Sequence, residues 1–354
     1  ARVLAPVPWF PSANPRFGEW AIHARAPRRE TRHDIAIEHP RYPVIPRIGM
    51  NLAPWLLYRA ALPALRRLVA DGLEFDAIDA HYLYPDGVAA VWLGRALGKP
   101  VVVTARGTDV NLIPRHAVPR RLIRGAIAGA SALVAVSAAL AEALIGLGAP
   151  AHKVTVLRNG VDTNLFRPPA DRAIARAALG LAGPTLISVG HLIERKGHDL
   201  AIAALAELPG FSLLIVGEGP ERARLVALAE RLGLADRVRL LGDRPQAELP
   251  ALYGAADMLV LASSREGWAN VLLEAMACGT PVVASDIWGN PEVVRAPEAG
   301  RIVARSAAGV AQGVRALAAA APDRAATRAY AEGFGWGPTT EGQIALFRRI
   351  TGAA

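Results

Sequence analysis

The chain has 354 residues, of which 52% are hydrophobic and 20% are charged, and its formal net charge is +9. This composition is typical of a globular protein long enough for two domains, and it excludes a disordered chain. A single cysteine, Cys278, excludes a disulfide framework or a cysteine-built zinc site and suits a reducing cytosol. Because no apolar stretch of about 18 residues lacks a charge or a helix breaker, we expect a cytoplasmic protein without a transmembrane helix or a secretory signal.

The positive charge is concentrated in the first half of the chain. Residues 1–165 carry 20 Lys and Arg against 12 Asp and Glu, whereas residues 166–354 carry 20 against 19. A GC-biased genome rich in arginine codons explains this as well as an anionic partner does. The densest patch, RHAVPRRLIRGAI, mixes basic and apolar residues as in a helix lying on lipid headgroups, which favours peripheral contact with an anionic membrane through Arg115–Arg124. Few aromatic residues stand between the arginines, so we expect no nucleic-acid partner.

Short β-type runs alternate with longer helical runs along the chain. The first series contains FDAIDAH, PVVVTA, SALVAVS and KVTVLRNG, and after Pro168 and Pro169 a second series contains PTLISVG, FSLLIVGEG, RVRLLG, ADMLVLAS and PVVASD. Strands that are apolar throughout, followed by helices that close on glycine, predict parallel sheets covered on both faces. We therefore predict an α/β chain of two Rossmann-like domains, residues 1–165 and 166–332, with a cleft between them.

Ligands of open parallel sheets bind outside the carboxyl ends of the strands, and four loops of the second half fall there. These loops are VGHLIERKGHD, VGEGP, SSREGWAN and SDIWGN. Arg195 and Lys196 in the first loop are the cations that a diphosphate needs. VGEGP lacks the third glycine of a dinucleotide-binding fingerprint, which argues against a nicotinamide-dependent oxidoreductase.

The stretch EGWANVLLEAMACGTPVVASD places Glu274 in an apolar run, eight residues after Glu266. Asn270 is a good N-cap and Gly279 a stop signal, so the pattern predicts a helix over 271–278. Glu274 is then the one charge on an apolar face, where it can accept hydrogen bonds from two ribose hydroxyls. The alternative is a partly buried structural ion pair.

The same stretch resembles the E-x7-E signature of retaining glycosyltransferases of family 4, which have the GT-B fold of two facing Rossmann-like domains. GNPEVV, SVGHLIERKG, LIVGEGPER, LYGAADMLVLAS and VLRNGVD are similar to that family as well. DAHYLYPDGVAA and TARGTDVNLIP resemble its bacterial exopolysaccharide and teichuronic-acid-type sugar transferases. The resemblance implies a C-terminal helix within 333–354 that crosses back to the N-domain.

The resemblance also implies a role for each matching residue. Glu274 would bind the ribose and Glu266 would lie under the donor sugar, while His81, Arg195 and Lys196 would complete the catalytic set with Glu266. Arg106 and Asp109 would border the acceptor. The donor-binding set implied in this way is Gly190, Arg195, Lys196, Glu218, Glu266, Gly267, Trp268, Asn270, Val271, Leu272 and Glu274.

The implied reaction is hexosyl transfer, with retained configuration, from a nucleotide-diphosphate sugar to a hydroxyl of a glycan or polyprenyl-diphosphate-linked acceptor in cell-surface polysaccharide synthesis. We expect no cofactor and no metal ion, because the chain has no Asp-x-Asp pair. A nucleotide-sugar epimerase of the same fold and a non-catalytic sugar-nucleotide binder are the alternatives. The opening RVLAPVPWFP resembles the family's second strand, so we expect that about 35–45 residues are missing before it, unless the family's start simply varies here.

Overall fold

The computed structural model describes residues 1–44 and 49–352. The chain divides into two units. Unit 1 comprises Ala1–Val136, Leu140–Val156 and the chain from Gln343 onward, and unit 2 comprises Ser137–Ala139 and Leu157–Gly342. The chain therefore passes between the units four times.

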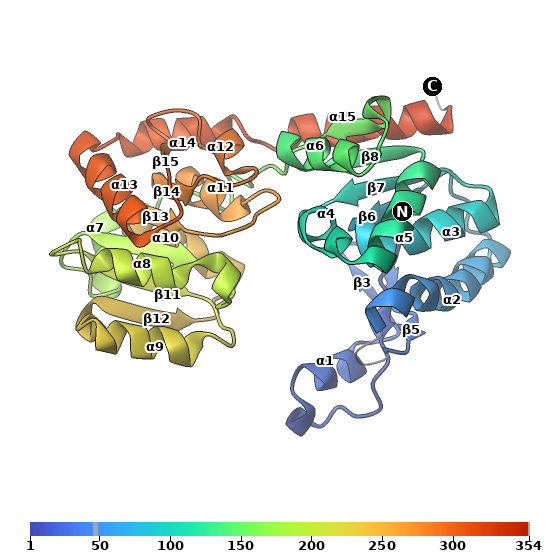
Figure 1. The fold of residues 1–354 in the computed structure, drawn as a ribbon, viewed down its shortest axis with the longest axis horizontal. Coiled ribbons are helices and arrows are strands. Elements are labelled where there is room, and N and C mark those ends of the chain that lie inside the picture. The colour runs from blue at the N-terminus through green and yellow to red at the C-terminus, as the bar shows by residue number, and fades with distance from the viewer. Residues whose placement is uncertain (45–48, 353–354) are drawn as a thin grey trace. The chain divides into compact units, whose positions relative to one another are not determined.

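Unit 1 contains a four-stranded parallel sheet in the order β6-β7-β8-β9 (Figure 1). Its strands are β6 (Ile78–His81), β7 (Val101–Ala105), β8 (Ala132–Ala135) and β9 (Val154–Val156). Every residue of β7 and β8 is buried, as expected for parallel strands covered on both faces. The associated helices are α2 (Gly49–Ala70), α3 (Val88–Leu97), α4 (Thr108–Asn111), α5 (Ala117–Gly129), α6 (Ala138–Gly146) and α15 (Gly337–Thr351), of which α6 and α15 begin in unit 2.

The beginning of unit 1 forms two further small sheets. One has the order β1-β4-β3, with β1 parallel and β3 antiparallel to β4, and the other pairs β2 with β5. The elements are β1 (Arg2–Leu4), β2 (Val7–Pro8), α1 (Glu19–Arg25), β3 (Arg29–Arg32), β4 (Ile35–Glu38) and β5 (Arg41–Tyr42). The antiparallel β3–β4 hairpin departs from the all-parallel sheet that the alternating pattern predicted.

Unit 2 is built on a six-stranded parallel sheet in the order β12-β11-β10-β13-β14-β15. This is the strand order of a Rossmann sheet, in which the order reverses between β10 and β13. The strands are β10 (Thr185–Val189), β11 (Ser212–Val216), β12 (Val238–Gly242), β13 (Met258–Leu261), β14 (Val282–Ser285) and β15 (Gly300–Val303).

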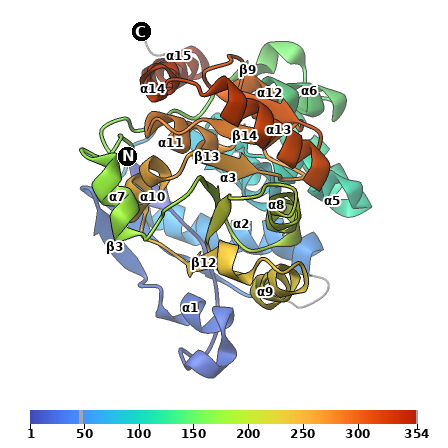
Figure 2. The ribbon, with the colours of Figure 1, turned by 90° about the vertical axis from the view of Figure 1, so that its left-hand side faces the viewer.

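Helices cover both faces of this sheet (Figure 2). On one face, apolar side chains of β10, β11 and β13 form one core with α8 (His198–Leu205), α9 (Arg222–Arg231) and α13 (Ala307–Ala320). The other helices are α7 (Arg172–Ala178), α10 (Leu249–Ala255), α11 (Asn270–Ala277), α12 (Asn290–Val293) and α14 (Arg324–Glu332), of which α11 contacts β13, β14, α10 and α14. The loops after β10 and β13 leave the sheet on either side of the point where the strand order reverses, so this is where a ligand is expected.

Candidate functional site

The loop after β10 places Lys196 against the end of its own strand. Gly190 follows β10 with φ +151°, and a Cβ on Gly190 would lie 3.2 Å from Lys196 Cε. The aliphatic part of Lys196 therefore packs over a position where a side chain would be both strained and crowded. Arg195 and Lys196 belong to a 3-10 turn (Glu194–Lys196) that leads directly into α8.

The loop after β13 meets these two cations through Glu266. Lys196 Nζ lies 2.8 Å from Glu266 Oε1, and Arg195 Nη1 lies 3.4 Å from Glu266 Oε2. Arg195 also donates to the carbonyl of Arg265 at 2.8 Å, and its own carbonyl accepts from the backbone N–H of Ser264 at 2.8 Å. Glu266 is only 9% exposed. Two cations thus share one carboxylate, which leaves a local positive charge for an anionic ligand.

Glu274, on α11, is held by a neighbouring tyrosine rather than by a cation. The hydroxyl of Tyr253, a fully buried side chain of α10, donates to Glu274 Oε2 at 2.9 Å. Burial raises the pKa of Glu274, while this hydrogen bond and the charge of Lys196 act in the opposite direction. Within residues 1–44 and 49–352 Glu274 forms no ion pair, so the structural ion-pair alternative does not describe this carboxylate. Its Oε1 remains available to a ligand hydroxyl.

The helix that carries Glu274 starts one residue earlier than predicted. It spans Asn270–Ala277, and Ala269 precedes it without a side-chain capping bond. The expected capping role of Asn270 is therefore wrong, because its side-chain oxygen instead accepts from Asn159 Nδ2 at 3.1 Å. Gly279, at φ +74°, ends the helix as predicted. Asn270 is exposed and Val271 and Glu274 are half-buried, whereas the other residues of this helix are buried in the core.

Several side chains of the expected donor-binding set lie in the core. Leu272 is fully buried, and Trp268 is 6% exposed, with its ring against Arg158 and Phe334. A ligand could therefore contact Leu272 and Trp268 through their backbone groups rather than through their side chains. Gly267 is also buried. Glu218, on the loop after β11, is half-exposed and pairs with Arg222 at 3.1 Å.

A buried histidine, His198, lies beneath the Lys196 loop and is not among the residues predicted from the sequence. His198 begins α8, is 2% exposed, and places Nδ1 2.9 Å from the hydroxyl of Ser188 on β10. Burial lowers the pKa of His198 from 6.5 to about 4, so the ring is neutral. In the sequence, the only sign of its importance is its position directly after Lys196 and Gly197. Its partner Ser188 lies on a separate strand, so no local pattern links the two.

In unit 1, the predicted catalytic residue His81 lies next to Arg106, which was predicted on the acceptor side. His81 ends β6, as predicted, and its Nδ1 lies 2.6 Å from Arg106 Nη2, while Nε2 lies 3.3 Å from Asp79. The guanidinium donates to Nδ1, which leaves the ring proton on Nε2, facing the carboxylate. Asp109 is fully buried and accepts from the backbone N–H groups of Leu83, Arg106 and Gly107. Asp109 therefore shapes the turn that carries Arg106, and its carboxylate is not open to a ligand.

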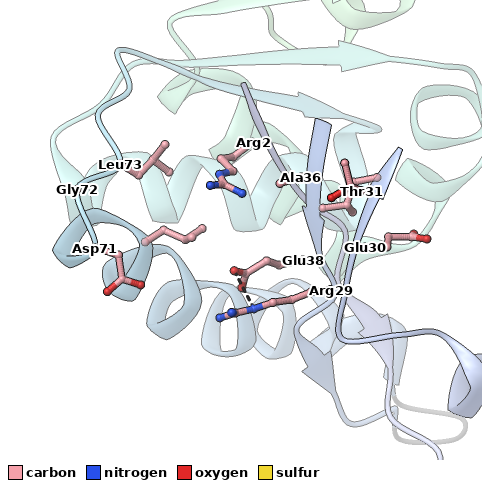
Figure 3. A pocket seen from close by; sticks show the side chains of 11 residues that line it. Arg2, Arg29, Glu30, Thr31, Ala36, Glu38, Asp71, Gly72 and Leu73 are labelled. Carbon is pink, nitrogen blue, oxygen red and sulfur yellow. Dashed lines mark ion pairs between the residues drawn. The ribbon is translucent and has the colours of Figure 1, made fainter. Parts of the chain in front are cut away.

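Two cavities of unit 1 lie away from these residues. One, of ≈ 600 Å³, runs along β4 between Arg2, Asp71 and the Arg29–Glu38 ion pair (Figure 3). Its lining contains none of the residues that were predicted to bind the donor or to border the acceptor. The other, of ≈ 320 Å³, is lined by Arg120, Arg124, Gly146 and Leu147 on the predicted membrane patch.

Membrane spans and metal clusters are absent from the described part of the chain. None of its helices combines the length and the apolar character that crossing a membrane requires. In the same residues, no group of three or more His, Cys, Asp or Glu side chains is placed to hold a metal ion.

Comparison with known proteins places both halves of the chain. Residues 19–165 match the family described as "Glycosyltransferase Family 4", and residues 171–334 match "Glycosyl transferases group 1". The two halves of the chain thus match, one after the other, the two family models of the family 4 type of GT-B glycosyltransferases. The predicted fold class, α/β with two Rossmann-like domains, is thereby confirmed.

The relatives and solved structures that this chain resembles carry names of different enzymes. A D-inositol 3-phosphate glycosyltransferase of Segniliparus rotundus is 39% identical over 56% of the chain and 47% of its own length, and one of Mycobacterium tuberculosis is 36% identical. The chain thus spans about half the length of the curated relatives it matches. HepE of Anabaena, solved with UDP, matches at 26% identity with TM-score 0.73, covering 88% of this chain and 86% of HepE. Sucrose-phosphate synthase of Thermosynechococcus elongatus shares the fold, with TM-score 0.78 over 93% and 87% of the two chains at 24% identity.

Proposed function

We propose that this glycosyltransferase moves a hexosyl group from a nucleotide-diphosphate sugar to an acceptor hydroxyl, with retained anomeric configuration and without a metal ion. Unit 2 binds the donor. The main observation in support of this proposal is the cluster of Arg195, Lys196 and Glu266. Glu274 lies close enough for the charge of Lys196 to lower its pKa.

The cluster suits the chemistry of a departing diphosphate. Negative charge develops on the leaving phosphate as the glycosidic bond breaks, and fixed cations at that point stabilise the transition state. In this structure Arg195 and Lys196 already face a carboxylate, so the donor's diphosphate would share them with Glu266. Glu274 Oε1 would accept the ribose hydroxyl. Because HepE was solved in complex with UDP, UDP is the first nucleotide to test.

For the acceptor we propose a glycan or a polyprenyl-diphosphate-linked glycan of cell-surface polysaccharide synthesis, bound in unit 1 near His81 and Arg106. The net positive charge of residues 1–165 and the exposed arginines of α5 support an anionic acceptor or an anionic membrane surface. The curated relatives are named for inositol 3-phosphate, an anionic polyol. A phosphorylated polyol is therefore the second acceptor class to test.

The direct experiment is turnover of UDP-glucose, UDP-N-acetylglucosamine, GDP-mannose and ADP-glucose with each acceptor class. Proton NMR of the product gives the anomeric configuration, and EDTA is added to a parallel reaction. The proposal predicts a glycoside with the donor's configuration, formed at the same rate in EDTA. An inverted product or a reaction abolished by EDTA would contradict the mechanism.

A second arm of the experiment omits the acceptor and so addresses the epimerase and the non-catalytic binder. Conversion of the donor to an isomeric sugar nucleotide would identify an epimerase. Nucleotide binding without any turnover, with every donor and acceptor, would identify a non-catalytic binder.

A further inference from the structure

Glu292, on α12, joins two places where the chain passes between the units. Its carboxylate accepts from the backbone N–H groups of Ala138 and Ala139 at 3.0 Å each, and from Arg158 Nη2 at 2.6 Å. Ala138 and Ala139 belong to the short segment of unit 2 that continues into α6, and Arg158 follows the next return of the chain to unit 2. Although burial opposes ionisation, these donors hold the pKa of Glu292 below its ordinary value, so the carboxylate is charged.

The segment around Arg158 also contacts the loop that we assign to the donor. The Arg158 guanidinium lies 5.8 Å from the centre of the Trp268 ring, and Asn159 Nδ2 donates to Asn270 Oδ1 at 3.1 Å. Trp268 and Asn270 lie between Glu266 and Glu274 in the sequence. The segment Arg158–Asn159 is therefore bonded to the expected donor loop on one side and to Glu292 on the other.

Backbone packing closes the same network next to α12. A Cβ on Gly289 would lie 2.6 Å from the carbonyl oxygen of Gly267 and 3.3 Å from Ser137 Cβ. The backbone at Gly289 thus fits between the donor loop and the segment that leads into α6, at a distance only glycine allows. The hydroxyl of Thr339, shortly before the last passage at Gly342, donates to the carbonyl of Arg158.

We propose that Glu292 and Arg158 are positioning residues that couple the donor loop to the segments where the chain passes between the units. The inference rests on the proposed donor site in unit 2. When a nucleotide orders residues 266–270, Trp268 and Asn270 restrain Arg158 and Asn159. Because Glu292 bonds to both Arg158 and the start of α6, the start of α6 is restrained as well. Such coupling is reciprocal, so the arrangement of the chain passages sets donor affinity to the same extent.

Hydrogen exchange of the full chain tests this coupling, with mass spectrometry of peptides and with UDP, GDP and ADP added in turn. In the wild-type protein we expect slower exchange on nucleotide binding in residues 190–197 and 266–274. Exchange in residues 137–140 and 157–161 should slow too, by about fivefold. In Glu292→Gln the effect at 266–274 remains and the effect at 137–140 is lost, because one N–H donor and Arg158 lose their charged acceptor.

Two further variants separate coupling from a general loss of stability. Arg158→Met keeps the Glu292 bonds to Ala138 and Ala139 but removes the contact with Trp268, and it should also lose the effect at 137–140. Glu248→Gln breaks an exposed glutamate–arginine pair of the same unit, Glu248 with Arg244 at 3.4 Å, and should behave as wild type. If one variant does not fold, the other still decides.

Each failure has a distinct signature. Nucleotide-dependent slowing confined to 190–197 and 266–274 would overturn the coupling and leave the donor site standing. Slowing at 137–140 that persists in both Glu292→Gln and Arg158→Met would show that the coupling does not run through these residues. No slowing anywhere with any of the three nucleotides would overturn the donor site and the coupling together.

Discussion

Replacing His198 by glutamine is expected to change how the stability of the protein depends on pH. His198 is 2% exposed, bonds to Ser188, and has a pKa lowered by burial from 6.5 to about 4. Since the unfolded chain takes up the proton more readily, the stability gained by keeping the ring neutral is complete above pH 6.5 and is lost as the pH falls toward 4. The shift corresponds to about 2 kcal/mol of stability lost between pH 7.5 and pH 5.

Urea unfolding of the wild type and His198→Gln at pH 7.5 and pH 5 measures this loss. At pH 7.5 the variant should be less stable by about 1–2 kcal/mol, because packing and the Ser188 bond are disturbed. At pH 5 the variant should have recovered about 2 kcal/mol relative to the wild type, and other titrating groups cancel in the difference. His191→Gln, at an exposed histidine of the same unit, should show no such change. A stability difference between wild type and His198→Gln that is the same at both pH values would show that His198 does not titrate with a lowered pKa.

Three other variants test the phosphate contact, the buried aspartate of unit 1 and the membrane patch. Lys196→Met should weaken UDP binding by about tenfold or more, because it removes a charge-assisted contact; calorimetric titration with UDP and uridine should show the loss for UDP alone, and equal losses for both would contradict a phosphate role. Asp109→Asn should cost about 2 kcal/mol of unfolding free energy, because the amide nitrogen that replaces one carboxylate oxygen cannot accept from the backbone N–H of Leu83 or of Gly107; a loss below about 0.5 kcal/mol in urea titrations would be too small for that role. Replacing the basic side chains of the α5 region by glutamine should abolish salt-sensitive binding to vesicles containing phosphatidylglycerol, and binding to neutral vesicles of equal strength would speak against an electrostatic contact. The four positions are Arg115, Arg120, Arg121 and Arg124.

The sheet of unit 2 could be read largely from the sequence, because its strands are short apolar runs that end in glycine-bearing loops. PTLISVG, FSLLIVGEG, ADMLVLAS and PVVASD all contain strands of the six-stranded sheet. The strand Gly300–Val303 was not assigned, since an arginine interrupts it and it is only half-buried after its first residue. The β3–β4 hairpin was missed for a related reason: RETR is mostly charged and exposed, so it carries no apolar alternation.

Within the candidate site, some pairings follow from the order of the strands and others depend on three-dimensional packing. The rule that ligands bind at the carboxyl ends of parallel strands is enough to group Arg195 and Lys196 with the Glu266 loop. It does not supply Tyr253, which reaches Glu274 from a separate helix, nor Glu292, which meets Arg158 across more than a hundred residues. Those contacts depend on how helices and loops pack in three dimensions, and no local pattern encodes them.

Melting temperatures with UDP, GDP, ADP and TDP, measured for the wild type and Glu274→Gln, test whether unit 2 is a donor site with Glu274 on the ribose. Burial raises the pKa of Glu274. The contribution of protonated Glu274 to the stability of the fold is therefore fully present below pH 4.5 and is lost as the pH rises through the raised pKa. At pH 7.5 the glutamine variant should therefore melt no lower than the wild type without ligand.

We expect one of the four nucleotides to raise the wild-type melting temperature, by an amount equivalent to about 2.7 kcal/mol when the nucleotide is at a hundred times its Kd. The same nucleotide should leave Glu274→Gln nearly unchanged. An equal rise in both proteins, or no rise in the wild type with any of the four, would contradict the assignment of this site.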